Sequence, residues 1–326
     1  MDSLLKNLNE PQKEAVCQFD GPVLILAGAG SGKTRVITHR IAAMLNAGIN
    51  PWNILAVTFT NKAAEEMKKR VEVLSPGKSA DVFISTYHSL CAKFLRVEAS
   101  QTGLNRHFVI YDDVDQKNLI KECVKDLGYD EKKFRPGMIM ELISRAKDEL
   151  LDAASYEIHS RASNDSFREM ISSIYKLYEQ KLKKFNALDF GDLIMKSVEA
   201  LRDNQQLRDK YQERFKYILI DEYQDTNHAQ YMLTKYFAAK HKNICVVGDE
   251  DQAIYMWRGA DIRNILEFER DYKNVKTIKL EQNYRSTKRI LTAAMNVVRN
   301  NVSRKEKELW TDKNEGEDIT VSELSS

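Results

Sequence analysis

VLILAGAGSGKTR, at residues 23–35, joins a run of apolar residues to a glycine-rich turn and then to a lysine and a threonine. The run at 23–27 predicts a strand buried on both faces, and the pattern from Thr34 to Leu45 predicts a helix. Glycines let successive backbone N–H groups point inward, and the N-terminus of the following helix adds partial positive charge. The stretch therefore predicts an anion-binding loop between a strand and a helix.

The loop follows the phosphate-binding pattern GxxxxGK[ST], except that alanine stands at the first position. We assign Lys33 to the β- and γ-phosphates of a nucleotide and the Thr34 hydroxyl to Mg²⁺. A glycine-rich turn with an exposed lysine is the simpler alternative, but the ordered succession of strand, loop and helix favours the phosphate site. The predicted phosphate-site residues are Ala27, Gly28, Ala29, Gly30, Ser31, Gly32, Lys33 and Thr34.

Further apolar runs with strand character recur along the chain. They lie at residues 54–60, 82–86, 217–221, 244–249 and 275–280. Helical patterns separate the first of them, as at 62–74, where apolar residues form one stripe. Alternating strands and helices predict an α/β fold, with a parallel sheet, right-handed crossovers and helices on both faces. Ligands of such sheets gather at the carboxyl ends of the strands.

Acidic and amide side chains come directly after two of these strands. We expect Asp221 to hold Mg²⁺ and Glu222 to accept the proton of an attacking water. Adjacent acids at a strand end more often form a turn or a helix cap, and the phosphate loop is the reason to favour catalysis here. Gln252, after the strand at 244–247, is expected to hold that water or sense the γ-phosphate, although an ordinary loop glutamine would look the same.

Gln12 has two open interpretations. Asn9 and Gln12 have the spacing of a capping box at the start of an N-terminal helix. An amide at this place can also contact adenine, and both roles can hold together.

From about residue 108 to 184 the strand pattern is replaced by helical periodicity, which predicts an all-helical insertion. The predicted division assigns 1–107 and 188–277 to the α/β domain, 108–187 to the insertion and 278–326 to a separate C-terminal part. The segment after Trp310 is expected to be a loop.

Composition excludes some classes of protein. The chain has 326 residues and a formal net charge of +2, so any nucleic-acid surface must be local. Its apolar runs are too short for a membrane span, and its first residues do not form a secretory signal. Its four cysteines form no CxxC pair, so we expect no zinc site and a reduced, cytoplasmic setting.

Seven segments together resemble one known family. They are LNEPQ (8–12), AGAGSGKTR (27–35), FTNKAAEEMKKR (59–70), STYHSL (85–90), DEYQDT (221–226), VVGDEDQAIYMWRGAD (246–261) and EQNYRSTKRI (281–290). In this order they resemble the UvrD/PcrA/Rep family of superfamily-one DNA helicases. The resemblance implies a RecA-like motor lobe, with 278–326 as the start of a second lobe. It also implies an ATP-driven motor that moves 3′ to 5′ on single-stranded DNA and separates duplex junctions, with repair or replication proteins as partners.

The resemblance also implies roles for residues around ATP and Mg²⁺. Gln12 would read adenine, and Arg35 and Tyr284 would flank the base. Gln252 and Arg285 would approach the γ-phosphate, with Arg285 acting as an arginine finger from the second lobe. The implied catalytic residues are Lys33, Glu222, Gln252 and Arg285.

A further set matches the family's single-strand contacts: Phe59, Asn61, His88, Tyr255, Trp257 and Arg258. Aromatic faces stack on any base, which suits a motor indifferent to sequence. Core packing is the alternative for the aromatic residues, and a structural role is the alternative for His88. Basic runs at 62–70, 181–184 and 304–307 are explained at least as well by solvated helix faces as by phosphate contacts.

The sequence departs from the family pattern at three places. Ala253 stands where many members have serine, and Gly191 interrupts an acidic position in LDFGD (188–192). Too few residues remain after Arg285 for a second motor lobe. We therefore expect an N-terminal part of a helicase that binds ATP, hydrolyses it slowly and does not unwind DNA. The motor part of a helicase–nuclease complex and an ATP-gated DNA-binding module remain alternatives.

Overall fold

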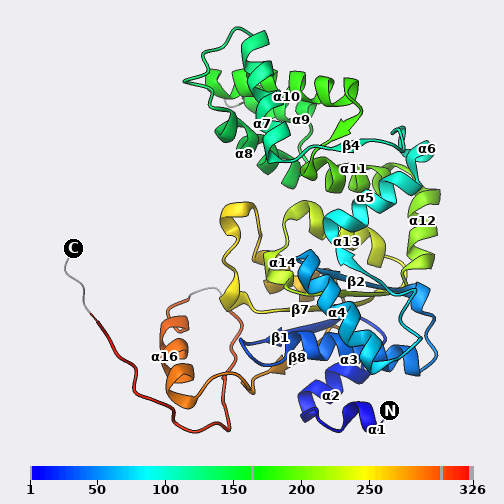
Figure 1. The fold of residues 1–326 in the computed structure, drawn as a ribbon, viewed down its shortest axis with the longest axis vertical. Helices are drawn as coiled ribbons and strands as arrows, with labels where there is room; N and C mark the ends of the chain where they lie inside the picture. The colour runs from blue at the N-terminus through cyan, green and yellow to red at the C-terminus, as the bar shows by residue number, and fades with distance from the viewer. Residues whose placement is uncertain (1, 163–164, 302–303, 323–326) are drawn as a thin grey trace. The chain divides into compact units, whose positions relative to one another are not determined.

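The computed structural model describes residues 2–162, 165–301 and 304–322, and Figure 1 labels its elements. The chain divides into two compact units. Unit 1 comprises Met1–Thr86, Gln212–Thr226 and Ala238–Ser326, and unit 2 comprises Tyr87–Tyr211 and Asn227–Phe237. Unit 1 is thus assembled from three separate stretches of sequence. The four-part division with boundaries at 107, 187 and 277 stays a prediction.

Unit 1 is built on a parallel sheet, which confirms the predicted α/β fold. Its strands are β1 (Val23–Ala27), β2 (Ile54–Thr58), β3 (Phe83–Thr86), β6 (Tyr217–Ile220), β7 (Asn243–Gly248) and β8 (Lys276–Leu280). Their order is β3-β2-β6-β7-β1-β8, and every neighbouring pair is parallel. The carboxyl ends of β1, β6 and β7 therefore lie side by side at one edge of the sheet.

The last strand, β8, belongs to the sheet of unit 1. It pairs with β1 along its whole length, from Val23 opposite Lys276 to Ala27 opposite Leu280. Main-chain hydrogen bonding to β1 therefore makes β8 the edge strand of the first sheet.

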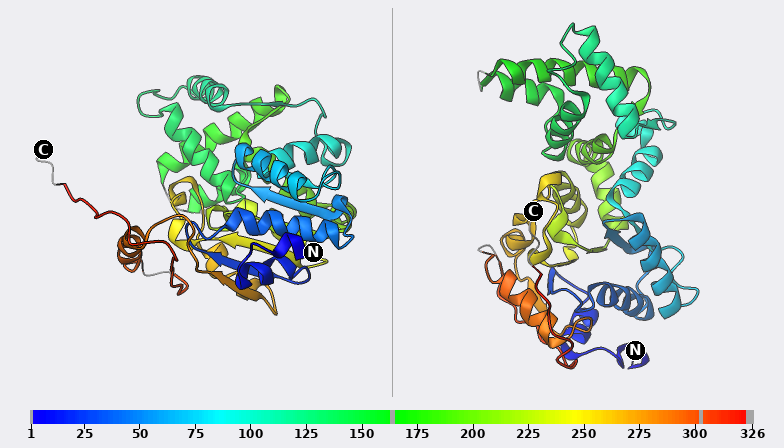
Figure 2. Two further views of the ribbon diagram at one scale, coloured as in Figure 1. Left: turned by 60° about the horizontal axis from the view of Figure 1, so that its bottom comes forward. Right: turned by 60° about the vertical axis from the view of Figure 1, so that its left-hand side comes forward.

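Both faces of the sheet are covered. One set of alternating strand residues, including Ile25, Ala56 and Val247, packs in one core with residues of α2, α3 and α4. The intervening residues, such as Leu24 and Val246, are also buried. Figure 2 shows the blue helices of the N-terminal part lying along the sheet. Such two-sided burial explains why the strands read as unbroken apolar runs.

The helices of unit 1 include those predicted at 34–45 and 62–74. They are α1 (Asp2–Leu5), α2 (Glu10–Cys17), α3 (Lys33–Asn46), η1 (Pro51–Asn53), α4 (Asn61–Leu74), η2 (Tyr223–Asp225), η3 (Glu250–Gln252), η4 (Met256–Arg258), α14 (Arg263–Leu266), α15 (Phe268–Asp271) and α16 (Lys288–Val298). After Trp310 the described residues form neither helix nor extended strand, as predicted.

The described residues of unit 2 are helical apart from one short strand pair. Its helices are α5 (Tyr87–Val97), α6 (Ala99–Thr102), α7 (Asp113–Asp126), α8 (Pro136–Asp148), α9 (Ala153–Ala162), α10 (Ser166–Lys184) and α11 (Phe190–Asp203), and α12 (Gln205–Arg214) and α13 (His228–Ala238) run to its boundaries. β4 (Val109–Ile110) and β5 (Ala187–Leu188) pair in parallel. Two residues per strand are too few to show a period, so the sequence predicts helices alone. Across the described ranges, no helix is both long enough and apolar enough to cross a membrane.

A buried charge cluster joins three helices of unit 2. Nζ of Lys147 lies 2.7 Å from Glu179, 2.8 Å from Asp189 and 2.9 Å from Asp192. Burial alone lowers the pKa of Lys147, but the neighbouring carboxylates raise it well above its usual value. Gly191 leaves room for this lysine, because an added Cβ would lie 2.9 Å from Cδ of Lys147. The departure from the family pattern at Gly191 thus has a steric reason.

Replacing Gly191 with alanine is therefore expected to destabilise unit 2 by about 1–2 kcal/mol, because Lys147 is fixed by its ion pairs and cannot yield. Gly137 is the matched control, since it also lies at the second position of a helix and an added Cβ meets nothing within 4 Å. Gly137→Ala should be neutral or stabilising by up to about 1 kcal/mol. Urea unfolding measures both, and equal effects at the two glycines would contradict the steric explanation.

Candidate functional site

The phosphate loop lies between β1 and α3, where the sequence predicts it. Gly30 and Gly32 have φ angles of +70° and +91°, which L side chains rarely adopt. A Cβ on Gly30 would also lie 2.8 Å from Cβ of Arg285 and 2.9 Å from Nδ2 of Asn283. Position 30 therefore requires glycine both for its conformation and for the close approach of the segment after β8. Thr34 is half-buried in the first turn of α3.

Gln12 is fully buried against this loop. Its Nε2 donates to the carbonyl of Ser31 over 2.9 Å, and its Oε1 accepts from the N–H of Asn9 over 3.2 Å. The Asn9 side chain accepts from the N–H of Gln12 in return, which confirms the predicted capping box. Arg35 donates to the carbonyl of Asn7 over 2.9 Å. Contacts of Gln12 and Arg35 with adenine stay predictions.

Asn283 is a residue of this site that the sequence analysis missed. Its buried Nδ2 donates to the carbonyl of Ala29 over 2.7 Å. Its Oδ1 accepts from the N–H groups of Arg285 and Ser286, each over 2.8 Å. The sequence NYRS (283–286) is the signal that could have identified it. Asparagine readily accepts hydrogen bonds from the backbone N–H groups that follow it in a turn. Asn283 therefore fastens the segment after β8 to the phosphate loop.

The structure brings Tyr284 and Arg285 to the same loop. The N–H of Tyr284 donates to the carbonyl of Gly30 over 2.9 Å, and its hydroxyl lies 2.9 Å from Nδ2 of Asn9. Arg285 is exposed beside Gly30. Their roles at the base and the γ-phosphate stay predictions.

Asp221 and Glu222 come directly after the carboxyl end of β6. Nζ of Lys33 lies 2.7 Å from Oε2 of Glu222, so the lysine of the phosphate loop meets the acid pair. The N–H of Asp221 donates to the carbonyl of Val57 in β2 over 2.9 Å, which continues the sheet ladder. Glu222 then turns away with a φ of +52°, a conformation that is uncommon outside glycine.

Two carboxyl groups here hold their protons unusually tightly. Burial, and then repulsion from Glu222, raises the pKa of Asp221 to about 7. The same causes raise the pKa of Asp225 to about 6. Oδ1 of Asp225 is buried and accepts no hydrogen bond from the described residues. A divalent cation held by Asp221 would relieve its repulsion from Glu222, and carboxylate and hydroxyl oxygens are the ligands that Mg²⁺ prefers.

Replacing Asp221 with asparagine is expected to stabilise the metal-free and nucleotide-free protein at pH 8. The pKa of Asp221 rises on folding from 3.8 to about 7, so its protonated form favours folding below pH 3.8 and this contribution is lost as pH rises through 7. At 1.36 kcal/mol per pKa unit, the penalty that asparagine removes at pH 8 is at most about 4 kcal/mol.

Scanning calorimetry from pH 5 to 8 should show the Tm advantage of Asp221→Asn shrinking as pH falls. The exposed Asp209 provides a control in which asparagine should leave Tm nearly unchanged throughout. A Tm difference that is the same at every pH would contradict the raised pKa of Asp221.

Gln252 is connected to Glu222 through a chain of hydrogen bonds. Nε2 of Gln252 donates to Oδ2 of Asp249. The N–H of Asp249 donates to Oε1 of Gln224 over 3.0 Å, and Nε2 of Gln224 donates to Oε2 of Glu222 over 3.0 Å. Gly248 allows this approach, since a Cβ there would lie 2.6 Å from Oε1 of Gln224. The loops after β6 and β7 are therefore joined directly at the site.

Predicted DNA-contacting residues of unit 1 include an exposed aromatic group. Phe59 and Tyr255 stack with ring centroids 5.0 Å apart and an interplanar angle of 28°. Phe59 is 40% exposed and Trp257 is 64% exposed, so neither is a core residue. Oδ1 of Asn61 accepts from the Thr86 hydroxyl over 3.3 Å. The aromatic faces suit base stacking, although the DNA role of each residue stays a prediction.

The other two predicted DNA contacts are His88 and Arg258. His88 belongs to unit 2, where its ring meets Phe190 edge to face at 5.6 Å between centroids. Burial lowers the pKa of His88 below its usual 6.5, so the ring is neutral at pH 7. Both the structural role and the DNA contact of His88 stay predictions. The side chain of Arg258 lies outside the described residues.

The basic runs differ in their surroundings. Lys68 and Lys69 are exposed on α4, and Lys181 lies 2.7 Å from Asp126. Lys307, by contrast, is buried. Both alternatives therefore stay open for the first run, whereas the burial of Lys307 sets the third run apart.

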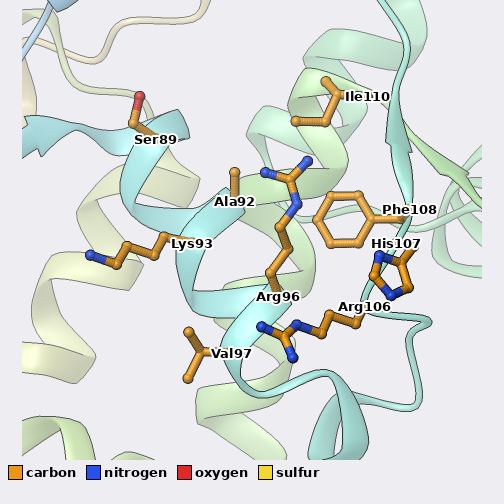
Figure 3. Close-up of a pocket in the computed structure, with 9 residues that line it drawn as sticks. All are labelled: Ser89, Ala92, Lys93, Arg96, Val97, Arg106, His107, Phe108 and Ile110. Atoms are coloured by element: carbon orange, nitrogen blue, oxygen red, sulfur yellow. The ribbon is translucent and has the colours of Figure 1, made fainter.

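A hollow of about 720 Å³ opens in unit 2 beside α5 (Figure 3). Arg96 lies over the ring of Phe108, 4.9 Å from its centroid, and Lys93, Arg106 and His107 also line the hollow. The residues that line it include no carboxylate among those described. Its lining is positive, but the predicted site residues lie elsewhere.

A phosphate loop after β1, an acid pair after β6 and a parallel sheet define a P-loop nucleotide-binding protein with a RecA-like core. The family model of the UvrD/REP helicase N-terminal domain matches residues 8–273. That of the UvrD-like helicase C-terminal domain matches residues 278–326. The chain belongs to the UvrD/REP helicase family, as its motifs indicate.

Curated relatives carry the name ATP-dependent DNA helicase PcrA. The protein from Bacillus subtilis is 52% identical over 317 residues, which cover 97% of this chain and 42% of the relative. That from Staphylococcus epidermidis is 50% identical over 99% of this chain and 44% of the relative. That from Staphylococcus aureus is 50% identical over 98% of this chain and 43% of the relative. The chain thus spans less than half the length of these relatives.

Proposed function

We propose that this chain is the ATP-binding part of a cytoplasmic DNA helicase that moves 3′ to 5′ along single-stranded DNA. The observation that carries the proposal is the 2.7 Å contact between Lys33 of the phosphate loop and Glu222 of the acid pair. This contact places the ammonium group of Lys33, which can bind phosphates, beside the carboxylate of Glu222, which can accept a proton from water. The relatives named ATP-dependent DNA helicase support DNA as the second ligand, with duplex junctions, repair and replication as the proposed setting.

In this proposal each residue acts on the triphosphate or on the attacking water. The loop N–H groups and Lys33 bind the β- and γ-phosphates, and Thr34 and Asp221 hold Mg²⁺, which neutralises phosphate charge when bound. Glu222 accepts a proton from the water that attacks the γ-phosphate, and Gln252 orients that water. Arg285 adds positive charge beside the loop as the γ-phosphate leaves.

Exposed aromatic residues supply the proposed DNA contact. Phe59, Tyr255 and Trp257 present ring faces that stack on bases without reading sequence. Asn61, at the first position of α4, begins the helix that comes after Phe59. Single-stranded DNA that is held by stacking can shift from one aromatic residue to the next as nucleotide is bound and released. A translocating motor requires this property.

ATP turnover with and without single-stranded DNA tests the proposal. We expect the 326-residue chain to bind Mg²⁺–ATP and to hydrolyse it slowly, because it spans less than half the length of the relatives named ATP-dependent DNA helicase. A chain continued to the length of the relatives should be strongly stimulated by single-stranded DNA and should unwind a duplex with a 3′ tail.

Turnover that ignores DNA in the longer chain would instead favour an ATP-gated binding module. Rapid unwinding by the 326-residue chain alone would contradict the proposed need for further residues.

A further inference from the structure

Residues 304–311, here named the strap, run along unit 1 from the loop after β7 to the phosphate loop. The sequence does not decide whether the basic residues of the strap contact phosphates or lie on a solvated helix face. The structure supports neither role for Lys307, because its side chain is only 1% exposed. A lysine buried this deeply requires partners.

Three consecutive carboxylates surround Lys307. Its Nζ lies 2.7 Å from Oδ1 of Asp249, 2.9 Å from Oε1 of Glu250 and 3.1 Å from Oδ2 of Asp251. The carboxylates are themselves buried, with 3%, 0% and 8% of their side chains exposed. Burial by itself lowers the pKa of Lys307, but these acids raise it above its usual value, so the ammonium group stays charged.

The other basic residues of the strap do not replace it. Arg304 pairs with Asp251 over 3.0 Å. Lys305 pairs over 2.7 Å with Glu269, which lies outside the acidic trio. Removing Lys307 would therefore leave Asp249 and Glu250 buried without this cation, which is strongly unfavourable.

Asp249 connects Lys307 to the nucleotide site. Its Oδ1 meets Lys307 and its Oδ2 accepts the hydrogen bond from Gln252. Its N–H donates to Gln224, which in turn donates to Glu222. The orientation of the Gln252 amide thus depends on a carboxylate that Lys307 holds from the opposite side.

The far end of the strap lies against the phosphate loop. A Cβ on Gly28 would overlap the side chain of Leu309, so the two residues pack closely. The N–H of Trp310 donates to the carbonyl of Glu281 over 3.0 Å, and its carbonyl accepts from Asn283 over 2.7 Å. The strap is therefore fixed on both sides of Lys307, and the ammonium group has little freedom to move.

We propose that Lys307 is a positioning residue of the nucleotide site, which clamps the carboxylate of Asp249 and thereby fixes the Gln252 amide that faces the γ-phosphate. The inference rests on the proposed function, because it assigns Gln252 to the hydrolysis step. It adds a residue from the strap to a site otherwise formed by the loops after β1, β6, β7 and β8. Since the ammonium group of Lys307 lies against Asp249, Glu250 and Asp251 in the loop after β7, its effect should fall on the chemical step and not on ATP binding.

Lys307→Met removes the charge and keeps most of the side-chain volume. We expect single-turnover ATP hydrolysis, with protein in excess, to slow by about 10- to 100-fold, since small displacements of a catalytic group have effects of this size. The Kd for Mg²⁺–ATP should change by less than about 3-fold, because the phosphate loop is untouched. Lys307→Arg should recover most of the rate, since it keeps a cation at the carboxylate.

Lys305→Met is the matched control, because Lys305 lies in the same strap and pairs with Glu269 instead. Its rate should stay within about 2-fold of the parent. The double variant Lys307→Met/Glu250→Gln separates folding from positioning. It removes one buried carboxylate together with the lysine and keeps the ion pair of Arg304 with Asp251. It should therefore restore most of the Tm, yet hydrolysis should stay slow because Asp249 still lacks its clamp.

The inference is overturned if folded Lys307→Met hydrolyses ATP at the parental rate, or if the double variant recovers rate and Tm together. It is also overturned if Lys307→Met weakens ATP binding as strongly as it slows hydrolysis. Lys33→Ala, measured beside these variants, checks the proposed function separately. Unchanged ATP affinity in Lys33→Ala would reject that function, whereas a large loss there with a normal Lys307→Met rate rejects only the role of Lys307.

Discussion

Replacing Lys33 with alanine is expected to weaken Mg²⁺–ATP binding by about 10²- to 10⁴-fold, the equivalent of two charge-assisted hydrogen bonds at about 1.5–3 kcal/mol each. The Lys33 side chain is 11% exposed and its Nζ lies 2.7 Å from Glu222, so it is already held at the mouth of the phosphate loop. Little conformational entropy remains to be lost when phosphate binds. Titration calorimetry with a non-hydrolysable ATP analogue measures the change.

Lys68→Ala controls for the loss of a positive charge alone, because Lys68 is exposed on α4. Its Kd should match that of the parent chain. A folded Lys33→Ala chain that binds the analogue with parental affinity would remove the basis for a nucleotide site at this loop.

Replacing Glu222 with glutamine is expected to slow single-turnover hydrolysis by about 10²- to 10⁴-fold, the usual contribution of a positioned general base. Glutamine keeps the size of the side chain and an oxygen for the amide of Gln224, 3.0 Å away. It cannot take a proton from water. ATP affinity should stay equal or rise, because the neutral amide no longer repels Asp221 or the triphosphate.

Rapid-quench measurement of hydrolysis, combined with the same calorimetric titration, separates these two effects. Glu10→Gln, on the exposed start of α2, is the control and should change neither quantity. If Glu222→Gln lost affinity while its bound ATP turned over at the parental rate, Glu222 would be a binding residue and not the base.

Features with a local cause were predicted well from the sequence. Gly30, Gly32 and Lys33 are close together in the chain, and the backbone chemistry of so short a segment allows few arrangements. The capping box of Asn9 and Gln12 is local in the same sense. The buried strands were recognised because burial on both faces leaves an apolar run, so their bounds differ from prediction by at most two residues.

Features that join distant parts of the chain were missed. Asn283 donates to Ala29 across 254 positions, and no single segment carries a sign of that partner. The pairing of β8 with β1 depends on strand order, which local patterns do not encode. Lys307 looked like part of a solvated basic run because its neighbours are charged, yet its partners lie in the loop after β7 and bury it. Such long-range charge pairing becomes visible only once the chain is folded.

The left-handed backbone at Glu222 bears on attempts to improve this protein by directed evolution. A non-glycine residue with a φ of +52° carries strain of about 1–2 kcal/mol. Screening for heat resistance alone would thus reward glycine at position 222, which relaxes the turn and removes a charge beside Asp221. The selected variants would resist heat but would no longer hydrolyse ATP. A library of substitutions at this turn therefore has to be screened for ATP turnover before it is screened for thermal stability.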